Sequence, residues 1–192
     1  VTMALDDGTL TTNDKLSIGL GVAKGMRYLH ERTPQVIHKA LTLTNVLLCE
    51  KRPTRGYTET MVKIANFSQA ESFGNVTQAN VVEKSGLDVA YMAPEFFISG
   101  RNRTFKIDVY AFGGFINMMF GGLPPRHALD FDGDLDSIKY YEGNPDDSDF
   151  KFPMVVQDVL DQPKLNDIVR TCLSGNPASR YAFDTIVFKL KE

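Results

Sequence analysis

The segment VIHKALTLTN, Val36 to Asn45, begins and ends with side chains that could do chemistry. Histidine can exchange protons near neutral pH, and an asparagine oxygen can bind a hard cation. Between His38 and Asn45, however, there is no carboxylate, and Lys39 is the only charged residue. The segment therefore has the outline of a catalytic loop but nothing inside it that could accept a proton. A histidine taken alone is more often a hydrogen-bonded core residue than a catalyst.

The elements that would position this segment are predicted from hydrophobic periodicity. Apolar residues at helical spacing predict a helix over about 13–32, with Asn13 or Asp14 as its cap. Two short apolar runs, NVLLC and MVKIANF, predict strands that follow the segment. The polar insert EKRPTRGYTET between them has turn signals, so a small solvated hairpin is expected near the candidate loop.

The second half of the chain predicts a buried helix and two late amphipathic helices. Residues 68–88 are polar without a sustained period and predict a long loop. Residues 105–120 are apolar on almost all sides, as in a buried helix. Amphipathic patterns within about 155–192 are interrupted by GNPASR. The acidic run DFDGDLD lacks EF-hand spacing, so a surface loop is favoured over a calcium site.

Composition bounds the class of protein. The chain has 192 residues, 43% of them hydrophobic, which suits a single domain spanning 1–192. A net charge of -3 gives no reason to expect nucleic acid or an anionic membrane as partner. The two cysteines, Cys49 and Cys172, form no metal-ligand pattern and fit a reducing, cytoplasmic compartment. No apolar run is long enough to span a membrane, and the start lacks a signal peptide and resembles a chain cut within a domain.

Several motifs stand in one order: YLHE, IHKALTLTN, VKIANFS, YMAPE, DVYAFG and CLSGNPASRY. This order resembles the large C-terminal lobe of a protein kinase, most closely the tyrosine-kinase-like and receptor-like branch. The resemblance covers nearly the whole chain and implies an α+β, mainly α-helical fold. It places the catalytic loop at 36–45 and the activation segment at 66–95. The N-terminal lobe, with its glycine-rich loop and phosphate-binding lysine, has no counterpart in the sequence.

The catalytic loop departs from the family pattern at three positions. In the family it reads His-Arg-Asp, with a lysine two residues later and then an asparagine; the aspartate accepts the substrate proton and the asparagine holds a metal ion. His38 and Asn45 match their counterparts. Lys39 replaces the arginine, which in the family pairs with a phosphorylated activation loop. Ala40 replaces the catalytic base, and Thr42 replaces the lysine.

The metal-binding motif Asp-Phe-Gly of the family is replaced by Asn66-Phe67-Ser68. Asn66 lacks the charge that a hard cation such as Mg²⁺ favours. Ser68 restricts the backbone where the family has glycine. Asp88 stands where serine/threonine kinases have a threonine, and it could hydrogen-bond Thr42. In the same loop Ser72, Thr77 and Ser85 are favoured as ordinary polar residues over phosphorylation sites.

The resemblance implies structural roles where the family pattern is kept. It implies a buried ion pair between Glu95 and Arg180, and a catalytic-loop anchor at Asp108. His38 and Phe67 would belong to the regulatory stack of side chains. Leu47 would lie beneath the adenine, supported by Phe115 and Met119. With Asn45, Leu47 is then a remnant of a nucleotide site.

These substitutions together predict that the chain is not an enzyme but a pseudokinase, a binding or regulatory module in signalling. The alternatives are a divergent serine/threonine kinase with weak phosphotransfer and a nucleotide-sensing module in a longer protein. The expectation is no catalytic residue and no metal or cofactor in this chain, with ATP and Mg²⁺ bound at most weakly in a longer protein. The expected partner is a protein, either an active kinase or the missing N-terminal part. The expected location is the cytoplasm, including the intracellular part of a membrane receptor.

Overall fold

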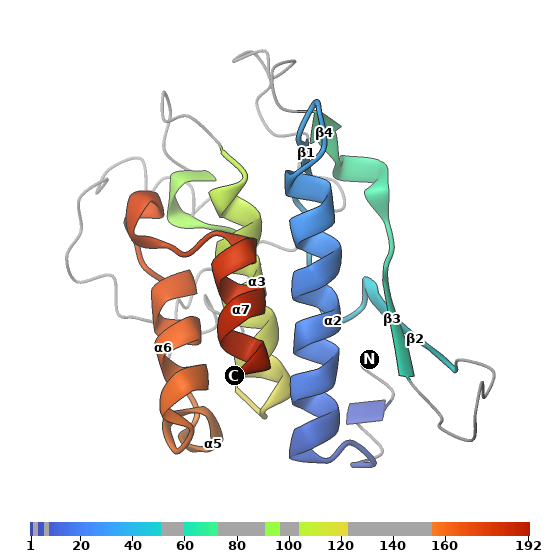
Figure 1. Ribbon diagram of the computed structural model, residues 1–192, viewed down its shortest axis with the longest axis vertical. Coiled ribbons are helices and arrows are strands. Elements are labelled where there is room, and N and C mark those ends of the chain that lie inside the picture. Colours follow the sequence, from blue (N-terminus) through green and yellow to red (C-terminus); the bar gives the residue numbers. More distant parts are fainter. Residues whose placement is uncertain (2–3, 6–7, 51–59, 73–90, 97–103, 123–154) are drawn as a thin grey trace, which may run out of the picture.

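The computed structural model describes residues 1, 4–5, 8–50, 60–72, 91–96, 104–122 and 155–192. Four of its helices lie roughly side by side: α2 (Thr12–His30), α3 (Lys106–Met119), α6 (Pro163–Cys172) and α7 (Phe183–Lys191) (Figure 1). A short helix, α5 (Gln157–Leu160), precedes α6. The strands over 46–50 and 60–64 lie on the side of α2 away from α3 and α6, and the strands over 36–37 and 71–72 lie near one end of α2 (Figure 1). The predicted mainly helical α+β class with a small hairpin is confirmed.

Helix α2 begins one residue earlier than predicted and has a different cap. Thr11 is the cap: its hydroxyl accepts a hydrogen bond from the Asp14 backbone N–H, and the Asp14 carboxylate accepts one from the Thr11 backbone N–H. This reciprocal pair satisfies two backbone donors that would otherwise be unpaired. The prediction of Asn13 or Asp14 as cap is therefore wrong, although Asp14 does take part. The helix buries an apolar face containing Ile18, Val22 and Met26.

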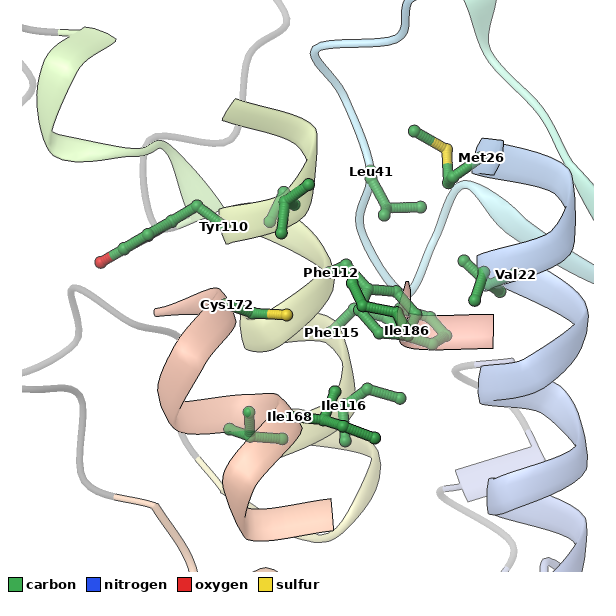
Figure 2. Close-up of a cluster of buried hydrophobic side chains, with 14 of the residues drawn as sticks. Val22, Met26, Leu41, Tyr110, Phe112, Phe115, Ile116, Ile168, Cys172 and Ile186 are labelled. Atoms are coloured by element: carbon green, nitrogen blue, oxygen red, sulfur yellow. The ribbon is translucent and has the colours of Figure 1, made fainter. Parts of the chain in front are cut away.

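Helix α3 is buried on all sides except at Lys106 and Met118, as its uniformly apolar sequence predicts. Figure 2 shows Phe112 and Phe115 lying between side chains of α2 and of the late helices. The helix approaches α6 closely at Gly113, where an added Cβ would lie 2.8 Å from the Cβ of Cys172. Complete burial raises the pKa of the Cys172 thiol to about 12, so this thiol stays neutral.

Two small antiparallel sheets accompany the helices. Strands β2 (Val46–Glu50) and β3 (Thr60–Ile64) form the predicted hairpin, with Val46 opposite Ile64. Strand β3 ends before the predicted Phe67 because Asn66 is left-handed, with φ 63°. The second sheet, β1 (Val36–Ile37) with β4 (Glu71–Ser72), was not predicted. It joins the candidate loop to the segment that follows Asn66.

The late part of the chain contains three helices, α5, α6 and α7. A 3₁₀ turn over Pro177–Ser179 separates α6 from α7 within GNPASR. Among the described residues no helix combines the length and the apolar character that a membrane span requires. Several predictions fall outside the described residues: the roles of Asp88, Thr77 and Ser85, most of the activation segment, the acidic run 130–136 and the insert 51–59.

Candidate active site

The candidate loop is fixed by one buried carboxylate, that of Asp108 on α3. The backbone N–H groups of His38 and Lys39 donate to its two oxygens, each over 2.8 Å. The Nε2 of His30, at the end of α2, lies 2.9 Å from the same carboxylate. Lys39 has a φ of 65°, a conformation that is unfavourable for a residue with a side chain. Its hydrogen bond to Asp108 stabilises that conformation and so sets the course of the loop.

His38 is fully buried and bonded at both ring nitrogens. Its Nδ1 accepts from the Ala40 backbone N–H at 3.3 Å, and its Nε2 donates to the Ala65 carbonyl oxygen at 3.1 Å. The Phe67 ring meets it edge-on, with centroids 4.9 Å apart. Burial lowers the pKa of His38, outweighing the opposite effect of Asp108. This neutral histidine joins the loop to the segment that contains Phe67, and both nitrogens are already in use.

Ala40, at the position of the family's base, offers a methyl group and its backbone. It is 5% exposed, and its carbonyl oxygen accepts a hydrogen bond from Asn45 Nδ2 at 2.8 Å. Thr42 is also buried, with its hydroxyl 2.9 Å from that of Thr44. The described part of this loop therefore contains no side chain that could take a substrate proton.

Asn45 and Asn66 lie side by side. The Nδ2 of Asn66 donates to Oδ1 of Asn45 at 3.3 Å, and Ser68 Oγ donates to Oδ1 of Asn66 at 2.7 Å. A Mg²⁺ ion favours carboxylate oxygens, whereas this pair offers two neutral amide oxygens that already accept hydrogen bonds. The described residues also contain no group of three or more His, Cys, Asp or Glu side chains that could hold a metal ion. The donor set does not fit a tight magnesium site.

Leu47, the other predicted remnant of a nucleotide site, is 48% exposed on β2, opposite Lys63. Its expected supports, Phe115 and Met119, are fully buried in α3. Phe67 contacts His38 yet is 47% exposed. Leu47 and Phe67 are thus large apolar side chains near Asn45 and Asn66 in sequence that remain open to solvent.

A second polar cluster surrounds Arg180, which is almost completely buried. Its two terminal nitrogens donate to the two carboxylate oxygens of Glu95, at 2.6 and 2.8 Å. The guanidinium also donates to the carbonyl oxygens of Ser174 and Lys106 and lies 5.0 Å from the Tyr110 ring centroid. Lys106 in turn donates to the Arg180 carbonyl oxygen. The pKa of Lys106 is lowered, mainly by burial and secondly by the nearby charge of Arg180. Arg180 and Glu95 thus neutralise each other's charge, and the Lys106 ammonium has a hydrogen-bond acceptor.

Sequence reasoning missed two polar contacts at the site. His30 reaches Asp108 across 78 residues of sequence, and the Lys39 ammonium forms an ion pair with Glu71. The YLHE motif contains His30, but nothing in its local sequence points to Asp108. Glu71 lies in a segment that was predicted as loop. The only feature of the sequence that could have indicated this pairing is that Glu71 carries a charge opposite to that of Lys39.

Comparison with known proteins gives the family. The profile for "Protein tyrosine and serine/threonine kinase" matches residues 2–190, so the chain belongs to the protein kinase family. The chain is 29% identical to dual specificity protein kinase splA of Dictyostelium discoideum, over 93% of the chain and 7% of that protein. It is 30% identical to cysteine-rich receptor-like protein kinase 10 of Arabidopsis thaliana, over 95% and 27%. With human serine/threonine-protein kinase TNNI3K it is 30% identical, over 62% and 13%.

The chain thus spans less than a third of the length of these relatives. Their names contradict one expectation. The substitutions at Ala40, Thr42 and Asn66 led to the prediction that the chain is not an enzyme, yet the relatives are named as serine/threonine, dual-specificity or receptor-like protein kinases. The physical reason for the error is that missing side chains at single positions lower a rate without deciding whether a family activity is retained.

Proposed function

We propose that the chain is the C-terminal lobe of a divergent protein kinase with slow phosphotransfer from ATP to protein hydroxyl groups. One observation carries the proposal: the catalytic loop is held by Asp108, and it presents Asn45 next to Asn66. The kinase names of the relatives support the same reaction. Since the chain is a small part of those relatives, the activity is proposed for the whole protein.

The chemistry permits a slow rate without a catalytic base. Phosphoryl transfer passes through a loose transition state in most kinases, and catalysis depends mainly on positioning and electrostatics. A general base typically contributes a factor of about 10²–10⁴, so Ala40 at that position predicts a rate lower by that order. Mg²⁺ favours carboxylate oxygens, and Asn66 offers a neutral amide instead, so weak binding of ATP with Mg²⁺ is expected. We assign no step to the metal ion.

A second role is favoured by the contrast between the substituted candidate site and the retained buried ion pair. The side chains at positions 40, 42 and 66 are neutral, whereas the buried pair of Glu95 and Arg180 is fully bonded. Such a domain could bind another protein, either an active kinase or the N-terminal part of its own chain, and regulate signalling. This role is compatible with slow phosphotransfer. The free cysteines and receptor-like relatives support a location inside the cell.

The test is a radiolabelled phosphotransfer assay on the full-length protein. We expect weak turnover that Asn45→Ala reduces to background and that Ala40→Asp raises by about 10²-fold. Asn13→Ala, at an exposed position on α2, is the matched control and should leave turnover unchanged. Turnover that is absent from the wild type, or that Asn45→Ala does not affect, would contradict the kinase proposal.

A further inference from the structure

Lys39 and Glu71 form an ion pair between the catalytic loop and the segment that follows Asn66. The other described contacts between these two segments are neutral. The Lys39 ammonium contacts the Glu71 carboxylate, and the side chains are 12% and 48% exposed respectively. Lys39 lies in the catalytic loop, and Glu71 lies five residues after Asn66. The other contacts described between these segments join backbone groups, amides or rings, as between Ala65 N–H and the Asn45 carbonyl oxygen at 2.9 Å. The ion pair is the charged link among them.

Both partners are held in place through their backbones. The backbone N–H of Lys39 is bonded to buried Asp108, which fixes the direction in which the side chain leaves the loop. Glu71 is held by strand β4, where it lies opposite Ile37 of β1. A typical surface ion pair contributes little because ordering two long side chains costs entropy. Here the backbone has already brought the two side chains together, so less of that cost remains.

We infer that Glu71 is a positioning residue that holds the start of the activation segment against the catalytic loop without any phosphate group. The Glu71 carboxylate supplies the negative charge that the partly buried Lys39 requires. By holding β4 on β1, it also keeps Asn66 and Phe67 against Asn45 and His38. A phosphate on a nearby hydroxyl would have to displace Glu71 before it could pair with Lys39. Ordering of the start of the activation segment, residues 69–72, is therefore independent of phosphorylation.

The inference is tested by hydrogen–deuterium exchange, which does not depend on kinase activity. Full-length protein made in bacteria, shown by mass spectrometry to carry no phosphate, should protect the amides of residues 36–39 and 69–72. Glu71→Gln should speed exchange in these two peptides about fivefold, which is the size expected for a well-ordered ion pair. The exchanged pair Lys39→Glu with Glu71→Lys should restore most of the protection.

The control is Glu31→Gln, which removes an exposed acid paired with Arg27 and should leave both peptides unchanged. Urea unfolding of each variant separates local opening from loss of the whole fold. Unphosphorylated protein without protection in these peptides would overturn the inference. Exchange unaffected by Glu71→Gln would also overturn it, as would a charge-exchanged variant no better protected than Glu71→Gln. None of these results bears on whether the protein transfers phosphate.

Discussion

Two polar regions of this kinase lobe differ in charge and in burial. Around Arg180, water is excluded, and a full ion pair with Glu95 is surrounded by further hydrogen bonds. Asn45 and Asn66 are themselves neutral, and Asn66 is exposed. A buried charge without its partner is costly, whereas an exposed amide in place of a carboxylate costs the fold little. The buried region is therefore tightly constrained by stability, and the open region can change its chemistry.

The largest expected effect comes from breaking the buried pair. Glu95→Gln leaves the Arg180 charge without a counter-charge in a site closed to water, which should lower the free energy of unfolding by about 3–5 kcal/mol. Arg180→Lys keeps the charge but loses the bidentate hydrogen bond to Glu95. Its free energy of unfolding should lie between those of Glu95→Gln and the wild type. Urea unfolding measures both. A loss below about 1 kcal/mol for Glu95→Gln would remove the contrast between the two regions.

Acidification should weaken the fold through His38. Since burial lowers the pKa of His38 in the folded protein, the unfolded chain binds the proton more readily. Stability is then full above the ordinary pKa of about 6.5 and falls as the pH drops below it, by at most about 1.4 kcal/mol per pH unit. The structural cause is that a protonated Nδ1 would face the Ala40 N–H.

His38→Gln is the variant that isolates this effect, because glutamine does not titrate. The difference in unfolding free energy between wild type and variant should shrink from pH 7.5 to pH 5.5. A constant difference over that range would show that protonation of His38 does not act on the fold.

An effect of about the same size at most is expected from restoring a charge to the open region. Asn66→Asp removes the N–H donor to Asn45 and places a carboxylate beside the Asn45 oxygen, as a hard cation requires. At a Mg²⁺ concentration ten times the Kd of such a site, binding adds about 1.4 kcal/mol of stability. The thermal midpoint should rise with Mg²⁺ in the variant and stay constant in the wild type.

Asn45→Ala in the Asn66→Asp background is the matched control and should abolish the response to Mg²⁺. An equal response in the wild type would show that the amide pair already binds the ion. In that case the neutral chemistry of the site would not explain weak metal binding.

The same contrast explains what the sequence could predict. The helices follow from periodicity because burial on one face or on all faces leaves a regular pattern, as in α3. The replacement of the family's catalytic carboxylate and lysine follows directly from Ala40 and Thr42. The pairing of Lys39 with Glu71, by contrast, depends on strands β1 and β4, and two residues are too few for a detectable alternation. The contact of His30 with Asp108 depends on helix packing across 78 residues.

The smallest expected effect is at the exposed pair of Arg27 and Glu31 on α2. Their charged atoms are 3.8 Å apart, and the side chains are 39% and 62% exposed. Such pairs contribute about 0.3–0.5 kcal/mol, and Glu31 also lies at the C-terminal end of the helix, where the dipole disfavours a negative charge. Glu31→Gln should therefore change the unfolding free energy by less than about 0.5 kcal/mol, and added salt should reduce the change further. A cost comparable to that of Glu95→Gln would mean that burial is not what separates strong from weak ion pairs in this lobe.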